Sequence, residues 1–156
     1  MNNKDQEIAL ACFRLGRSFF CIDVMRINEV VTSKAPSFLP CPTRFFQGVI
    51  TLRDAEIPVL DMRVRFNMAS RPDNEPGELI VVRLPDRLIA LAVDKVIEVI
   101  SVPGNRIMPP PDLEGPGAEC ILGVCHFQNH AVMVVNIDLL PGNDGSPLPL
   151  QPPVSG

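Results

Sequence analysis

The feature that most constrains the fold of this chain is an internal repeat. Residues 48–62 align without a gap with residues 123–137, which lie 75 positions further along the chain. A second match pairs residues 27–31 with residues 96–100. In each half the same order of strands, a glycine-containing hairpin and a short capped helix occurs. The chain is therefore predicted to contain two similar units.

Five residues of the longer repeat have predicted structural roles. Gly48 and Gly123 are expected at bends where a side chain would not fit. Asp61 and Asn136 precede short apolar segments and are strong N-caps, because their side-chain oxygens accept backbone N–H groups of the first helical turn. For Asp61 this role is favoured over that of a catalytic carboxylate. Pro58 lacks an N–H donor, so we expect it at an unpaired edge position.

Short β-branched segments separated by polar residues, Gly or Pro dominate the chain and predict strands. The expected strands are 8–14, 18–23, 26–31, 48–53, 56–60, 78–84, 87–93, 96–101, 122–128 and 131–135. Their spacing of roughly ten residues favours small barrels or a sandwich over an α/β sheet.

We predict an all-β fold of two five-stranded β-barrel subdomains, at about 8–66 and 78–140, with short capped helices. Each subdomain is small for an independent core, so we expect the two to pack on a shared hydrophobic seam within one domain, 1–140. Residues 67–77 are expected to form a linker. Residues 141–156 contain five prolines and are expected to be a disordered tail.

The composition is that of a globular protein, with 46% hydrophobic and 21% charged residues among 156. The net charge of −4 argues against nucleic acid and anionic lipid as partners, because both attract a surplus of Lys and Arg. The first residues are polar and no apolar run reaches the ~18 residues of a membrane span. We therefore expect a cytoplasmic protein without direct membrane insertion.

Several segments together carry a specific resemblance to a known family. They are 13–16, 20–24, 27–30, 42–53, 57–63, 92–96 and 134–138. In this order they resemble the CheW family of chemotaxis coupling proteins over the whole chain except its two ends. One departure is Asp54, where the family has Gly. Asp tolerates left-handed turn conformations, so the hairpin is expected to be kept.

The resemblance implies two five-stranded barrels, no catalytic activity and no cofactor. It implies an adaptor between the cytoplasmic tip of a methyl-accepting chemoreceptor and the regulatory domain of a CheA-type histidine kinase. The first barrel would meet the kinase, and the groove between the barrels would meet the receptor. The protein would thereby be recruited to membrane receptor arrays.

Two sets of residues match the family's partner-binding surface. Glu29 and Arg53 match a charged pair near that surface. The alternative is an exposed salt bridge that contributes little and has no role in binding. Ile27 matches an apolar position of the receptor groove, and Val30, Val96 and Val99 could extend it. The alternative is that these are ordinary core residues. Simple alternation along a strand lets only one face point to the core, so we do not expect all four on the same face.

A different class of function would be a small β-barrel enzyme or a metal-dependent sensor. Its candidate residues are Cys120, Cys125, His126 and His130, but their spacing fits no common zinc pattern. The five cysteines are expected to be small apolar core residues, and no metal site is predicted. Arg63 and Arg65, beside the first capped helix, are expected on a solvated face.

Overall fold

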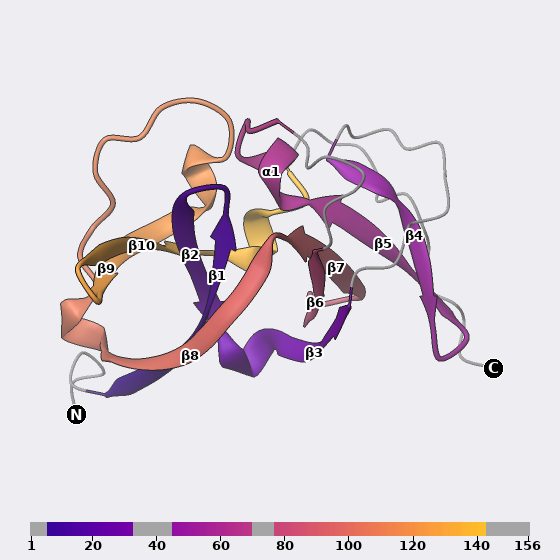
Figure 1. The fold of residues 1–156 in the computed structure, drawn as a ribbon, viewed down its shortest axis with the longest axis horizontal. Coiled ribbons are helices and arrows are strands. Elements are labelled where there is room, and N and C mark those ends of the chain that lie inside the picture. The colour runs from indigo at the N-terminus through magenta and orange to yellow at the C-terminus, as the bar shows by residue number, and fades with distance from the viewer. Residues whose placement is uncertain (1–5, 33–44, 70–76, 143–156) are drawn as a thin grey trace.

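The structure is a computed structural model that describes residues 6–32, 45–69 and 77–142. The described part contains ten strands in two five-stranded sheets (Figure 1). The first sheet has the order β8-β1-β2-β10-β9, formed by β1 (Glu7–Leu15), β2 (Ser18–Asp23), β8 (Lys95–Pro103), β9 (Ile121–Phe127) and β10 (His130–Val135). The second has the order β3-β6-β7-β5-β4, formed by β3 (Ile27–Thr32), β4 (Phe46–Leu52), β5 (Ala55–Asp61), β6 (Glu78–Arg83) and β7 (Leu88–Val93).

The helical segments of the described residues are short. They are η2 (Val24–Arg26), α1 (Met62–Arg65), η3 (Gly104–Arg106), η4 (Ala118–Cys120) and η5 (Ile137–Leu139). Among the described residues, no helix has the length and apolar character needed to cross a membrane. Each of the ten predicted strands overlaps an observed one, so the mostly-β prediction is confirmed.

The two sheets consist of equivalent strands, but each repeat contributes its first hairpin to the other sheet. The hairpin β1–β2 precedes β3 in the chain, yet it pairs with β8 and β10. The hairpin β6–β7 pairs with β3 and β5 in return. The predicted boundaries 8–66 and 78–140 are therefore wrong, because each sheet combines strands from both segments. Most of the predicted linker and nearly all of the predicted tail lie outside the described residues.

Buried apolar side chains form three clusters. The seam cluster takes residues from both sheets, among them Phe13, Phe20, Ile80 and Leu91. Alternate residues of the same strands point to the opposite face of their own sheet. There, the first sheet gathers side chains of all five strands, including Leu10, Cys21, Ile100, Cys125 and Val132. The second sheet does the same with Val31, Ile50, Val59, Val81 and Ala90.

A sheet whose five strands all contribute to one inner cluster must be strongly rolled. Among the described residues, however, the pairings include no ladder that closes either sheet. The two five-stranded sheets are thus confirmed and the closed barrels are not.

Gly48 and Gly123 both lie at irregular positions of their strands. A Cβ at Gly123 would be 2.6 Å from the Met108 carbonyl oxygen and 2.8 Å from Ile107 Cγ2. The reason is that the chain after β8 approaches β9 closely enough to form a bridge between Met108 and Val124. Gly48 lies at the register shift of β4 and has a φ of 154°, a value that favours glycine.

Asp61 and Asn136 are the N-caps of α1 and η5. The Asp61 carboxylate accepts hydrogen bonds from the Arg63 N–H at 3.0 Å and the Val64 N–H at 3.3 Å. The Asn136 side chain accepts one from the Asp138 N–H at 3.1 Å. Both short helices begin where the sequence predicts them.

Pro58 lies in an inner strand and not at the predicted edge. Its strand β5 is between β4 and β7. Counting from the closing pair Leu52–Ala55, alternation places Pro58 opposite Val49 at a pair that exchanges no hydrogen bonds. The ladder with β7 begins only at Val59. The missing N–H therefore removes no bond from either ladder.

The β4–β5 and β9–β10 hairpins close with the same type of two-residue turn. Arg53 and Asp54 have φ values of 49° and 67°, and Gln128 and Asn129 have 50° and 66°. Two consecutive positive φ values are typical of the type I′ turn, which suits the twist of a hairpin. Asp54 thus keeps the turn without the family's glycine.

Cutting the chain between residues 72 and 73 should give two fragments that are unfolded alone and fold when mixed. Each fragment lacks the hairpin that completes its own sheet, and each exposes its part of the seam cluster to water. Circular dichroism melts of the separate and mixed fragments test this. A cooperative melt of either fragment by itself would contradict the exchange of hairpins.

Candidate partner-binding surface

Four apolar residues of the edge strands face the seam between the sheets. Ile27 and Val30 of β3 are opposite Val82 and Ile80 of β6 in the ladder. Val96 and Val99 of β8 are opposite Phe13 and Ala11 of β1. All four of these opposing residues belong to the seam cluster, so the edge residues lie on the seam-facing sides of their sheets. We call Ile27, Val30, Val96 and Val99 the seam strip.

The seam strip is only partly covered by the protein. Ile27 and Val96 are half-buried and pack against the seam cluster. Val30 and Val99 are 42% and 58% exposed. The strip is therefore a continuation of the core that reaches the surface, and the alternative of ordinary core residues applies only to its inner half.

A β-bulge in each edge strand explains the three-residue spacing of the strip. Asn28 is an extra residue between Ile27 and Glu29 relative to β6. Ile97 is an extra residue between Val96 and Glu98 relative to β1. One extra residue returns the strand to the same face after three positions instead of two. The expectation that simple alternation separates these residues is therefore wrong, and both bulges lie at equivalent positions of the repeat.

The predicted Glu29–Arg53 pair is present and joins opposite edges of the second sheet. The Arg53 guanidinium donates to both carboxylate oxygens of Glu29, with a distance of 3.2 Å from Nη2 to Oε2. Glu29 lies on β3 and Arg53 in the β4–β5 turn, so the rolled sheet brings its two edge strands together here. The hydrogen bonds that Arg53 donates to Glu29 raise the pKa of Arg53. The Arg53 side chain remains 72% exposed, within reach of a partner.

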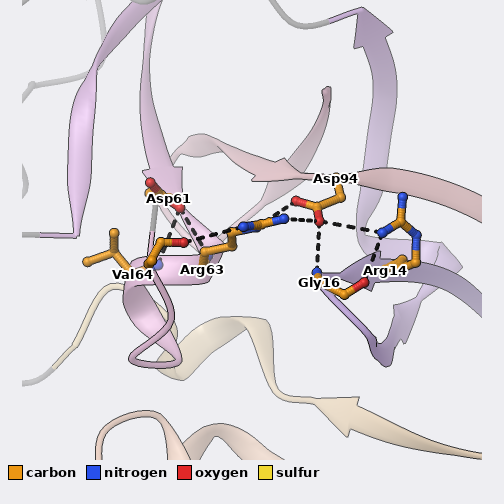
Figure 2. Close-up of polar contacts among 7 residues, drawn as sticks. Arg14, Gly16, Asp61, Arg63, Val64 and Asp94 are labelled. Atoms are coloured by element: carbon orange, nitrogen blue, oxygen red, sulfur yellow. Dashed lines mark hydrogen bonds and ion pairs between the residues drawn. The ribbon is translucent and has the colours of Figure 1, made fainter. Parts of the chain in front are cut away.

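The relative position of the two sheets is fixed by a network that the sequence analysis missed. Figure 2 shows the Asp94 carboxylate between Arg63 and the backbone of Gly16, with Arg14 beside it. Arg63 donates from Nε at 2.9 Å and from Nη2 at 2.5 Å, and the Gly16 N–H donates at 2.8 Å. Arg63 follows β5 of the second sheet, whereas Gly16 is in the β1–β2 turn of the first. Asp94 therefore ties the two sheets together.

Arg65 forms a second connection between the sheets and is 3% exposed. Its guanidinium donates to the carbonyl oxygens of Leu140 at 2.6 Å and Leu139 at 3.1 Å. It also donates to Glu119 at 2.9 Å, and this bond lowers the pKa of Glu119. The prediction of a solvated face for Arg63 and Arg65 is wrong. Both arginines lie in α1, and they are covered because their hydrogen-bond partners come from segments that are distant in the chain.

Asp94→Asn should destabilise the protein by about 2–3 kcal/mol. The substitution leaves the Arg63 guanidinium without a carboxylate in a site where Asp94 is 6% and Arg63 18% exposed. Loss of one partner from a buried pair costs roughly 3–5 kcal/mol, and the residual exposure of Arg63 reduces this. Urea denaturation gives the free energy of unfolding. Asp86→Asn is the control, since Asp86 is 73% exposed in a 3.9 Å pair, and equal losses in both variants would contradict the role of Asp94.

The proposed Cys/His cluster is not assembled. Cys120 and Cys125 are buried, whereas His126 and His130 are exposed. Within the described ranges, no three His, Cys, Asp or Glu side chains are placed to hold a metal ion. Burial raises the pKa of Cys120 to about 11, so its thiol is protonated near neutral pH. The hypothesis of a metal-dependent sensor or a small enzyme is not supported.

Comparisons with known proteins agree with the resemblance found in the sequence. Residues 9–142 match the model of the family described as CheW-like domain. The probable chemotaxis protein CheW of Rhizobium etli is 30% identical over 128 residues, which is 80% of this chain and 81% of the relative. The chemotaxis protein CheW of Treponema pallidum is 27% identical over 141 residues, which is 87% of this chain and 83% of the relative.

A solved structure shares the fold. The crystal structure of the scaffolding protein TtCheW from Thermoanaerobacter tengcongensis has a TM-score of 0.83 and 24% sequence identity, and the match covers 94% of this chain and 99% of that one. The family match extends over both sheets and all of the seam strip. The chain therefore belongs to the CheW-like domain family.

Proposed function

We propose that the chain binds the cytoplasmic tip of a methyl-accepting chemoreceptor through its seam strip and a CheA-type histidine kinase through its second sheet. Membership of the CheW family makes it a non-catalytic coupling adaptor of chemotaxis. Its place of action would be the cytoplasmic side of membrane receptor arrays. The observation that carries this proposal is the seam strip.

The seam strip has the chemistry of a surface for an amphipathic helix. Val30 and Val99 are exposed apolar side chains on two different sheets, and each lies opposite a residue of the seam cluster. An apolar surface beside a fixed core is what the apolar face of a helix requires, because burial of both faces removes them from water together. The helical tip of a receptor is a partner of this kind.

The kinase is proposed to bind near the Glu29–Arg53 pair. Arg53 presents a planar guanidinium at the end of a hairpin, and Glu29 holds it in one orientation. A pre-oriented arginine can donate hydrogen bonds to a partner carboxylate or carbonyl without much further loss of side-chain freedom. Because this hairpin belongs to the second sheet and Asp94 and Arg65 hold the two sheets together, the receptor and the kinase would bind to one rigid body.

A rigid adaptor can pass a signal only if its contacts differ between the states of its partners. If the receptor presents its helix differently in two states, the strip binds one state more tightly, and the kinase bound to the same body is biased in turn. The adaptor itself needs no conformational change for this coupling.

Val99→Ser should weaken binding of a soluble receptor-tip fragment by about tenfold, because it replaces apolar contact with a hydroxyl group at the most exposed residue of the strip. Titration calorimetry on the purified protein measures the affinity. Leu122→Ser is the matched control, since Leu122 is 57% and Val99 58% exposed, both in the first sheet. If the Val99 variant binds the fragment as tightly as the wild type does, the seam strip is not the receptor-binding site.

Arg53→Glu should weaken binding of the kinase regulatory domain about tenfold or more, because it places a second carboxylate beside Glu29. The thermal midpoint should stay close to that of the wild type, since the pair lies at the surface. Gln128→Glu is the control, because Gln128 occupies the equivalent turn position with almost the same φ. If the Arg53 variant binds the kinase with full affinity, the Glu29–Arg53 pair has no role in kinase binding. If the variant fails to fold, the role of the pair is structural.

A further inference from the structure

Met25 combines an exposed side chain with a fixed backbone. It lies in η2, which joins β2 of the first sheet to β3 of the second, and it is 74% exposed, the highest value among the large hydrophobic residues that the structure describes. Its N–H donates to Asp23 Oδ1 at 2.9 Å, and its carbonyl oxygen accepts from Arg83 Nη2 at 2.5 Å. Both backbone polar groups of Met25 are thus held by charged side chains.

The residue after Met25 extends this network to the other sheet. Arg26 donates to the carbonyl oxygen of Arg83 from Nε at 3.0 Å and from Nη2 at 2.7 Å. It also donates to both carboxylate oxygens of Asp138, at 2.5 Å and 3.2 Å. Asp138 belongs to η5, which follows β10 of the first sheet. The next residue of η5, Leu139, is a second exposed apolar side chain at 42%.

The network places two apolar side chains beside one bidentate ion pair, at the junction of the two sheets. On one side, Val24 packs against the seam cluster, and Ile27 directly after η2 is the first residue of the seam strip. Met25 is thus two residues from Ile27 in the chain, and the Arg26–Asp138 ion pair joins its segment to that of Leu139. This nearness to the strip identifies the occupant, because a helix that lies on Ile27 would also reach η2 directly before it.

Fixing the backbone of an exposed methionine adds little to the stability of the fold, since the side chain buries little apolar surface. It does reduce the cost of binding, because the turn is already ordered before a partner arrives. Methionine is also flexible and polarisable, which suits it for contact with an apolar partner of variable shape. Two cations, Arg26 and Arg83, and two carboxylates, Asp23 and Asp138, balance in charge here, so an apolar partner side chain meets no net charge.

We propose that Met25 is an anchor residue for the receptor helix, and that Met25 and Leu139 extend the receptor-binding surface beyond the seam strip. This inference rests on the proposed function. The matching feature of the partner is an apolar side chain on the face of the helix that lies on the strip. Arg26, Arg83 and Asp138 act as positioning residues that hold the anchor in place.

Titration of a soluble receptor-tip fragment into the full chain tests the anchor. Met25→Ser should weaken binding about tenfold or more, and equally at low and high salt, because the lost contact is apolar. Met25→Leu should bind within about twofold of the wild type, because it keeps the apolar volume. The control Met108→Ser removes a methionine that is 56% exposed in the chain after β8, and it should bind like the wild type. Thermal melts should be the same for all four proteins.

The outcomes separate the anchor from the adaptor function. If the wild type binds the receptor fragment and Val99→Ser weakens it while Met25→Ser does not, the inference is overturned and the proposed function stands. If the wild type does not bind the fragment at all, both are overturned. If Met25→Ser abolishes self-association of the chain in sedimentation and leaves receptor affinity unchanged, the methionine serves a contact between copies, which also overturns the inference.

Discussion

The arrangement of this protein depends on one carboxylate at the crossing between its sheets. Asp94 follows β7 of the second sheet and precedes β8 of the first, and it accepts hydrogen bonds from Arg63 on one side and Gly16 on the other. Each exchanged hairpin is paired within its new sheet, so the sheets are related to each other by the crossing segments, the seam cluster and the contacts of Asp94 and Arg65. The seam strip takes residues from both sheets, so its shape is defined only while this relation is fixed.

The seam strip arises from two β-bulges at equivalent positions of the repeat. A regular edge strand would turn every second residue away from the seam. The bulges at Asn28 and Ile97 instead present two apolar residues from each edge strand on the same side. Bulges commonly re-aim side chains at the rims of rolled sheets. Each unit of the repeat thus supplies half of the seam strip, so one unit alone could not form the whole strip.

Local sequence signals predicted the strands, turns and short helices. The features they did not predict depend on contacts between residues far apart in the chain. The capping residues Asp61 and Asn136 and the turn at Asp54 depend on a few neighbouring residues, so their chemistry is readable from the chain. The exchange of hairpins is not readable, because it is decided by pairing between strands that are far apart in the chain, such as β1 with β8. Arg63 and Arg65 look solvated for the same reason: their partners at Asp94 and Leu140 are distant in sequence. The Glu29–Arg53 pair was found only through the family resemblance.

The repeat has also diverged at its two junctions. The residue directly after the aligned segment is Arg63 in the first unit and Asp138 in the second. Both side chains connect the sheets, with opposite charges: Arg63 binds Asp94, and Asp138 binds Arg26. The first pair is 18% and 6% exposed, whereas the second is 43% for Asp138 and 31% for Arg26. Removing one partner from a buried pair is costly and an exposed pair contributes little, so the two junctions cannot serve the same purpose. The buried pair holds the sheets together, and the exposed pair holds η2 and η5 side by side, where their apolar residues are free to meet a partner.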